Sequence, residues 1–258
     1  MLKKNFVKLK LESGLPVIGT WGIIPSPIVT EVIASTDIDF IIIDQEHGPI
    51  NFETAQQMAT ACELHEVSPI MRVGGVNESD ILKALDIGMH GIQIPNVISA
   101  LDVKNIIEYS KYPPIGNRGF SPFTRAGNFS IESSKTLTER SNQNNIIGIN
   151  IEGVNAIENI DEILEFKALD VIFIGLFDLS KALGIPGEVK DKRVMDQLEI
   201  LTQKINAAGK YPGTIATNED DMKKYIALGI KYMLYLVDCE ILRNSYSTIV
   251  SNFKNINS

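Results

Sequence analysis

The chain has 258 residues, of which 44% are hydrophobic and 22% charged, with 19 glycines, 11 prolines and 2 cysteines. This composition is typical of a globular protein and excludes disordered, collagen-like and disulfide-stapled chains. The 32 acidic residues outnumber the 24 basic ones and give a net charge of −8, which argues against nucleic acid as a partner. No apolar run approaches the roughly 20 residues that span a bilayer, and no signal peptide begins the sequence. We therefore expect a cytoplasmic protein without a membrane partner, in which Cys62 and Cys239 are reduced.

Short β-branched segments alternate with longer amphipathic ones almost from end to end, which is typical of βα units around a parallel sheet. The expected strands are Val17–Trp21, Phe40–Asp44, Pro69–Val73, Gly91–Pro95, Ile146–Ile151, Val171–Gly175, Tyr211–Ala216 and Tyr232–Val237. The expected helices are Pro27–Ser35, Phe52–His65, Glu78–Ile87, Ser99–Tyr109, Asn155–Glu165, Val194–Ala208, Glu219–Leu228 and Cys239–Phe253.

Eight strands, each followed by a helix, predict an α/β fold: a (β/α)8 TIM barrel that forms one domain over residues 1–258. A doubly wound open sheet is the alternative, but no Gly-x-Gly-x-x-Gly follows the first strand. One long interruption, Tyr112–Asn145, separates the fourth helix from the fifth strand. A loop of this length is expected to serve the site or to contact another subunit.

Active sites of such barrels lie at the carboxyl ends of the strands. His47 follows the second strand, three residues after Asp44, whose carboxylate could orient the imidazole for proton transfer. Arg72 lies near the end of the third strand and could hold a carboxylate or an oxyanion. The alternative for Arg72 is a structural ion pair with Asp44, Glu46 or Asp86.

Asn150 and Glu152 are two residues apart on the fifth strand, so both side chains are expected to face the barrel axis. Asp178 follows the sixth strand. Two carboxylates at neighbouring strand ends predict a site for a hard divalent cation, Mg²⁺ or Mn²⁺ with Co²⁺ as a further possibility. The alternative is that each acidic residue only caps the helix that follows it. His65 and His90 are expected at the opposite end, as surface or packing residues.

The sequence lacks two features that other barrel enzymes use, which reduces the number of reaction types to consider. No lysine stands near the carboxyl end of an expected strand, so a Schiff-base mechanism has no obvious nucleophile. The seventh and eighth strands do not lead into the glycine-rich turns that bind phosphate in many barrels. A metal-assisted reaction on a non-phosphorylated keto acid fits what remains.

These residues resemble the HpcH/HpaI aldolases, and the matching segments occur in order over nearly the whole chain. They are Ile43–Pro49, the strand with Arg72, Leu85–Gly88, Ile92–Pro95, Tyr112–Gly119, Ile151–Glu152, Phe173–Gly175 and Asp178–Ser180. The resemblance implies a class II pyruvate aldolase, which cleaves a 4-hydroxy-2-oxo acid to pyruvate and an aldehyde. It also implies a homo-oligomer, a hexamer built as a trimer of dimers that exchange the C-terminal helix.

Roles for individual residues follow from the resemblance. Glu152 and Asp178 would hold the cation, which stabilises the pyruvate enolate as a Lewis acid. The catalytic set would be His47, oriented by Asp44, together with Arg72 and Asp86. The substrate would contact the residues at the ends of the third, fifth and sixth strands: Arg72, Asn150, Gly175, Leu176, Phe177 and Asp178.

The chain departs from the family pattern at two places. Asn150 stands where glutamine is common, and Leu176–Phe177 replaces a proline and a small residue. Two alternatives therefore stay beside the aldolase: another enolate-forming lyase of the citramalyl or malyl thioester type, and a catalytically silent relative that binds ligands.

Overall fold

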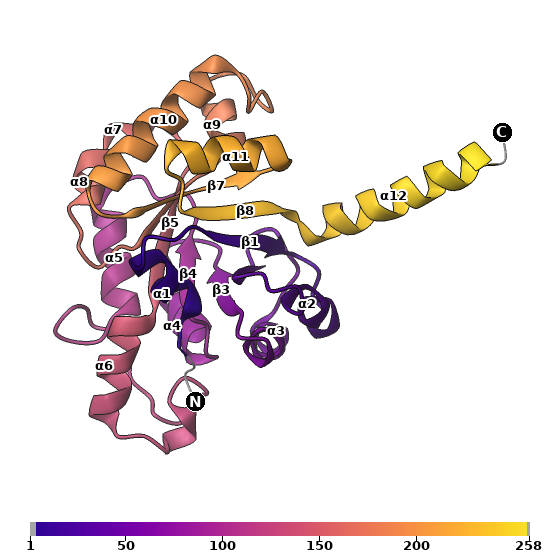
Figure 1. Cartoon of the computed structure of the whole chain (residues 1–258). Coiled ribbons are helices and arrows are strands. Elements are labelled where there is room, and N and C mark those ends of the chain that lie inside the picture. Colours follow the sequence, from indigo (N-terminus) through magenta and orange to yellow (C-terminus); the bar gives the residue numbers. More distant parts are fainter. Residues whose placement is uncertain (1–3, 257–258) are drawn as a thin grey trace.

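The computed structural model describes residues 4–256, which form one closed barrel of eight parallel strands in chain order (Figure 1). The predicted (β/α)8 fold is confirmed, and each strand lies within one residue of its expected ends. Residues 1–3 and 257–258 of the predicted domain lie outside the described part. The strands are β1 Val17–Gly22, β2 Phe40–Asp44, β3 Ser68–Arg72, β4 Gly91–Ile94, β5 Ile146–Ile151, β6 Val171–Ile174, β7 Tyr211–Ala216 and β8 Tyr232–Val237.

Helices surround the barrel, and their N-caps are mostly Asn or Ser side chains that accept a backbone N–H of the first turn. In chain order they are α1 Phe6–Glu12, α2 Pro27–Ala34, α3 Phe52–Leu64, α4 Glu78–Asp86, α5 Ala100–Ser110, the short 3₁₀ helix η1 Asn128–Ser130, α6 Ser134–Asn144, α7 Val154–Glu158, α8 Ile160–Leu164, α9 Leu176–Ala182, α10 Lys192–Ala207, α11 Glu219–Leu228 and α12 Asp238–Ile256.

The helices differ from expectation in three respects. The single helix expected over Asn155–Glu165 is two short ones, α7 and α8, with Asn159 between them. The helices α1 and α9 were not expected, because each has only seven residues. The interruption Tyr112–Asn145 is not one irregular loop, since its last third is α6. Its polar sequence conceals the helix, which buries only Leu137 and Ser141.

Strand pleating divides the side chains into an inner and an outer set. Ile147, Ile149 and Ile151 of β5 point outward into the large core between barrel and helices. Asn150 lies in the other register, buried and facing the axis, as its spacing predicted. This alternation is what brings polar side chains from several strands to one place.

The N-terminal end of the barrel is closed by α1. Val7 and Leu11 pack on interior residues of the strands, among them Phe40 and Tyr232. The buried Asn5 side chain donates to the carbonyls of His90 (2.8 Å) and Asn144 (2.9 Å). Ligands can therefore enter only from the carboxyl ends of the strands.

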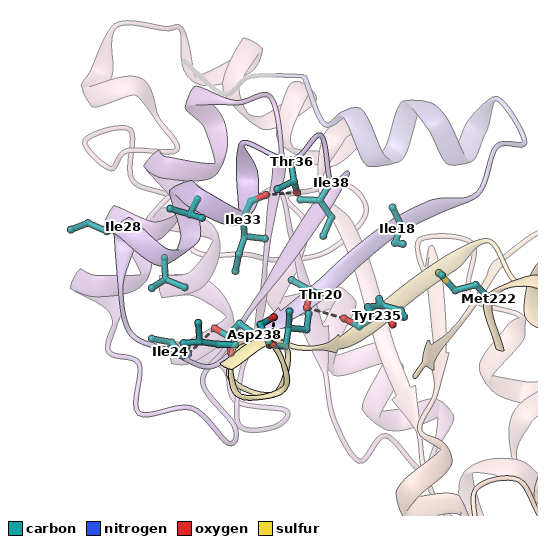
Figure 2. Close-up of a pocket in the computed structure, with 15 residues that line it drawn as sticks. Ile18, Thr20, Ile24, Ile28, Ile33, Thr36, Ile38, Met222, Tyr235 and Asp238 are labelled. Atoms are coloured by element: carbon teal, nitrogen blue, oxygen red, sulfur yellow. Dashed lines mark hydrogen bonds between the residues drawn. The ribbon is translucent and has the colours of Figure 1, made fainter. Parts of the chain in front are cut away.

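The C-terminal helix α12 projects away from the barrel (Figure 1). Its outer apolar side chains are exposed. An apolar groove of about 540 Å³ lies at its root, between β1, α2 and the first turns of α12 (Figure 2). Ile24, Ile28, Ile33 and Ile38 line it, with Asp238 at one edge. Among the helices formed by residues 4–256, none is long and apolar enough to cross a membrane.

Candidate active site

A second cavity of about 300 Å³ opens at the carboxyl ends of the strands, and it contains nearly all the residues expected to be functional. Seven of the eight strands, or the segments that follow them, contribute side chains to it, so residues far apart in sequence meet there. Its lining consists of Trp21, Ile23, Asp44, His47, Arg72, Asn150, Glu152, Phe173, Gly175, Leu176, Phe177, Asp178, Ile215 and Val237.

Arg72 is held rigidly at the floor of this cavity. Its guanidinium donates to both carboxylate oxygens of Asp44 (2.8 and 2.6 Å) and lies 2.9 Å from Glu46 Oε2. The guanidinium carbon, Cζ, is 4.0 Å from the centre of the Trp21 ring. Such a planar, doubly paired guanidinium is a fixed positive charge with one face on an aromatic ring. The expected ion pair is present, and it places Arg72 inside the cavity rather than away from it.

His47 lies at the rim with its side chain 70% exposed. The expectation that Asp44 orients the imidazole is wrong for this structure. Asp44 Oδ1 instead accepts the backbone N–H groups of Glu46 (3.0 Å) and His47 (3.4 Å), while both its oxygens bind Arg72. The carboxylate nearest to His47 Nε2 is Glu46, at 4.0 Å. The guanidinium takes Asp44 because a bidentate charged pair is stronger than a bond to imidazole.

Glu152 follows β5 and is positioned by two donors. Asn150 Nδ2 donates to its Oε1 (2.8 Å), and the backbone N–H of Asn96 lies 3.3 Å from its Oε2. Gly175 makes room for it, since a Cβ there would come within 2.8 Å of Glu152 Cγ. The shorter Asn150 thus still reaches the carboxylate, because residues i and i+2 share one face of the strand.

Two residues that the sequence reasoning did not single out hold Asn150 in place. Gln93 Nε2 donates to Asn150 Oδ1 (2.7 Å), and the Tyr232 hydroxyl lies 3.3 Å from Gln93 Oε1. All three side chains are buried inside the barrel. The signal for Gln93 was a polar residue between Ile92 and Ile94 on a strand of four residues. Buried polar networks of this kind fix the orientation of amides that otherwise could flip.

Negative charge is crowded at this mouth. Burial raises the pKa of Glu152 above its usual value, and the charges of Asp178 and Glu46 raise it further, although the hydrogen bond from Asn150 opposes them. Burial likewise raises the pKa of Glu46, against the opposing charge of Arg72. Carboxylates with raised pKa values in a cavity indicate a place where a bound cation or proton would be favourable.

The carboxylates that line the cavity suit a divalent cation in number and type. Within residues 4–256 no group of three or more His, Cys, Asp or Glu side chains is close enough to form a metal cage. Glu152 and Asp178 nevertheless line one cavity, and Mg²⁺ is commonly held by one or two carboxylates together with water and substrate oxygens. Asp178 is half exposed and lies 3.6 Å from Lys181 Nζ. The residues present therefore fit a cation that shares its coordination with substrate.

Asp86 is not among the residues that line this cavity, so the expectation that it belongs to the catalytic set is corrected. It ends α4, and a helix that follows β3 returns to the opposite end of the barrel. There its carboxylate binds Arg118 of the segment after α5 (2.6 Å). Burial raises its pKa while Arg118 opposes the rise. Asp86 thus anchors that segment in this chain.

The two bulky residues after Gly175 behave differently. Leu176 is buried against the outer core, whereas the Phe177 side chain is 54% exposed. Both line the cavity, so a partly exposed aromatic side chain forms part of its wall. The N–H of Gly175 is already bonded to the carbonyl of Ile151 (3.1 Å), so it is not free to receive a substrate carboxylate.

Comparison with known proteins agrees with this architecture. The sequence profile of the HpcH/HpaI aldolase/citrate lyase family matches residues 18–245. A 4-hydroxy-2-oxo-heptane-1,7-dioate aldolase from Shigella flexneri is 29% identical over 256 residues, covering 99% of this chain and 95% of the relative. The crystal structure of the citrate synthase SbnG has a TM-score of 0.89 and 31% identity, covering 99% of this chain and 100% of the other. That of an HpcH/HpaI aldolase from Desulfitobacterium hafniense DCB-2 has a TM-score of 0.92 and 27% identity, covering 96% of each chain.

The resemblance seen in the sequence motifs is therefore confirmed over almost the whole length. This chain belongs to the HpcH/HpaI aldolase/citrate lyase family.

Proposed function

We propose that the protein is a metal-dependent (class II) pyruvate aldolase, which reversibly cleaves a 4-hydroxy-2-oxo acid to pyruvate and an aldehyde. The observation that carries the proposal is the meeting of Glu152, Asp178, Arg72 and His47 in one cavity. Two carboxylates suit a divalent cation, Mg²⁺, Mn²⁺ or Co²⁺, and the arginine and histidine supply a fixed charge and a mobile proton. Arg72 ends β3, Glu152 follows β5 and Asp178 lies on α9 after β6, so their meeting is a property of the fold.

Glu152 and Asp178 would hold the cation, Glu152 through the carboxylate that Asn150 and Asn96 orient. When bound, a divalent cation withdraws electrons from the 2-oxo group and so makes a neighbouring C–H or C–C bond easier to break. Arg72 lies within the same cavity and can face the negative charge that develops on the keto oxygen. Its pairing with Asp44 and Glu46 fixes its position before substrate arrives.

His47 is the residue we assign to proton transfer. In cleavage it accepts the proton of the 4-hydroxyl, directly or through one water, as the bond between C3 and C4 breaks and the aldehyde forms. The bonding electrons remain with C3, which then takes up a proton to give the methyl group of pyruvate. In the other direction it returns that proton to the aldehyde oxygen. Its place at the exposed rim suits a group that must exchange protons with solvent.

The retro-aldol reaction provides the test. Purified protein with Mn²⁺ and a 4-hydroxy-2-oxo acid should release pyruvate, which lactate dehydrogenase and NADH detect. Exhaustive chelation should stop the release, added Mn²⁺, Co²⁺ or Mg²⁺ should restore it, and borohydride with pyruvate should leave the protein mass unchanged. Cleavage that survives chelation, with a pyruvyl adduct on a lysine, would replace the metal mechanism by a Schiff base. Cleavage of a citramalyl or malyl thioester alone would favour the other lyase, and no turnover of either class would favour a silent binding protein.

We also propose that the protein is a homo-oligomer in which two copies exchange α12. Outer residues of this helix such as Tyr246, Ile249 and Val250 are exposed. The helix itself projects away from the barrel (Figure 1). A solitary helix is marginally stable in water, and a second copy would supply the missing apolar contact. The groove at the helix root offers a complementary apolar surface (Figure 2). Ultracentrifugation should show a dimer or a hexamer, and Tyr246→Lys with Ile249→Lys should give a smaller species. A wild-type monomer would refute the exchange.

A further inference from the structure

The cavity has two chemically different halves. Its polar groups come from β2 and β3 and from the turns after β5 and β6. The strands β7, β8 and β1 are consecutive in the closed barrel, and this arc presents Ile215, Val237 and Ile23 to the cavity. Phe177 of α9 adds an exposed aromatic ring. A substrate whose keto acid lies on the polar half would therefore place the rest of its chain against an apolar wall.

The cations at or near this mouth are already paired. Arg72, the one permanent cation among the residues that line the cavity, binds two carboxylates of its own chain. Lys181 of α9 lies 3.6 Å from Asp178. Lys190, in the segment before α10, lies 3.3 Å from Asp221 at the start of α11. A second carboxylate on the substrate would meet apolar side chains and an excess of negative charge.

Burying an ionised carboxylate against apolar groups without a partner is strongly unfavourable. Contact with an aliphatic or aromatic tail on the same surface is favourable in proportion to the area removed from water. The polar half of the cavity thus favours the charged keto-acid end of a substrate, and the apolar half favours an uncharged tail.

We infer that the aldehyde this enzyme releases or accepts is uncharged and apolar, with its tail on the arc formed by Ile215, Val237 and Ile23. This inference rests on the proposed aldolase function. A relative is named for 4-hydroxy-2-oxo-heptane-1,7-dioate, whose seven carbons divide into pyruvate and a four-carbon aldehyde that ends in a carboxylate. In the addition reaction, pyruvate C3 loses a proton and bonds to the aldehyde carbon, and the aldehyde oxygen gains a proton. The tail takes no part in this exchange, so it only selects the substrate.

A matched pair of aldehydes tests the inference. Succinic semialdehyde and 4-methylpentanal have the same skeleton of non-hydrogen atoms, but the first ends in a carboxylate and the second in an isopropyl group. With pyruvate and Mn²⁺, kcat/KM for 4-methylpentanal should exceed that for succinic semialdehyde by about tenfold or more. A preference for succinic semialdehyde would overturn the inference.

Lysine substitutions on the apolar wall should move this ratio. Phe177→Lys, at an exposed position, and Ile215→Lys, on β7, should each shift the kcat/KM ratio toward succinic semialdehyde by about tenfold. Leu64→Lys is the matched control, because it adds the same charge at an exposed position at the end of α3, far from the cavity. If the wall variants move the ratio no more than Leu64→Lys does, the tail does not lie on this wall.

Exchange of the pyruvate methyl protons in deuterated water separates this inference from the proposed function, because it needs no aldehyde. Exchange by the wild-type protein with Mn²⁺, together with a preference for the charged aldehyde, would leave the aldolase in place and reject only the apolar acceptor. Failure to exchange with any of the three cations would reject the aldolase itself.

Discussion

The two ends of the barrel treat charge differently. At the N-terminal end cations and acceptors are matched: Lys8 binds Asp170 (3.0 Å), Arg118 binds Asp86, and Lys111 donates to two backbone carbonyls. At the carboxyl end Glu46 and Glu152 lie near further carboxylates, whose negative charges add to burial in raising both pKa values. One end of the barrel thus stabilises the fold, while the other holds like charges close together, and a cation or substrate can relieve their repulsion.

The largest expected effect is at Glu152. Replacing it by glutamine keeps the shape but removes the negative charge, so Mn²⁺ binding should be lost and aldolase activity should fall by about 10⁴-fold or more. Asp178→Ala should have the same effect, and both variants should remain folded. Asp161→Asn, which alters an exposed ion pair with Lys204 outside the cavity, is the control. Unchanged Mn²⁺ affinity by calorimetry in both cavity variants would show that the cation is held elsewhere.

His47→Ala should lower kcat by about 10²–10⁴-fold, because proton transfer loses its side chain. Metal binding should be retained, since His47 is not among the residues assigned to the cation. His65→Ala is the matched control, as this histidine lies at the other end of α3. A His47→Ala rate within threefold of wild type would remove His47 from the mechanism.

Gln93→Met tests the network behind Glu152. Methionine is close to glutamine in volume but cannot donate to Asn150, so the Asn150 amide loses the partner that fixes it. Mn²⁺ affinity should fall by about 10- to 100-fold, as for other residues that orient metal ligands. Gln93→Glu keeps an acceptor for the Tyr232 hydroxyl, but its carboxylate no longer donates to Asn150. An affinity equal to wild type in both variants would mean that Asn150 needs no support.

Asn5→Ala should affect stability and spare the site. The side chain is buried and bonds to His90, Asn144, Ser68 and the N–H of Lys8, so its loss should cost about 2–4 kcal/mol in the free energy of unfolding. Asn51→Ala removes an exposed helix cap of the same type and should cost about 1 kcal/mol. Urea unfolding measures both. A large loss of activity in the folded Asn5→Ala protein would contradict the division between the two ends.

The smallest effect concerns pH. Burial lowers the pKa of Lys111 from 10.5 to about 8. Between these values the unfolded chain holds the proton and the folded one does not, so this group makes the free energy of unfolding rise with pH, by at most about 1.4 kcal/mol per pH unit. Neutral Lys111 still has two N–H donors for its two carbonyls. In Lys111→Met this part of the rise between pH 8 and 10 should disappear; an unchanged slope would show that Lys111 does not titrate there.

The sequence predicted the barrel well because most of its strands are short, apolar segments, and polar residues end or follow several of them, as Asp44 does for β2 and Glu152 for β5. It predicted that Arg72, Asn150, Glu152 and Asp178 would meet, since parallel strands share one end. It could not predict that Arg72 would take both oxygens of Asp44 away from His47, because that depends on competition in three dimensions.

Other errors have similar physical causes. Asp86 was placed in the catalytic set by its motif, but the direction of α4 carries it to the opposite end. Gln93 and Tyr232 lie on different strands, so nothing in the linear pattern joins them. The helix α6 was missed because its sequence is almost wholly polar and its stability comes from contacts such as that of Asn142 with Tyr112.

The central claim is that the cavity promotes removal of a proton from pyruvate only when a divalent cation is held by Glu152 and Asp178. Nuclear magnetic resonance of pyruvate in deuterated water measures this directly as loss of the methyl signal. The wild-type protein incubated with Mn²⁺ should exchange these protons rapidly, and the metal is removed only after the reaction, before the spectrum is recorded. No exchange should occur after exhaustive chelation, nor with Glu152→Gln in the presence or absence of the metal. Exchange that continues without a cation, or that Glu152→Gln catalyses at the wild-type rate, would contradict it.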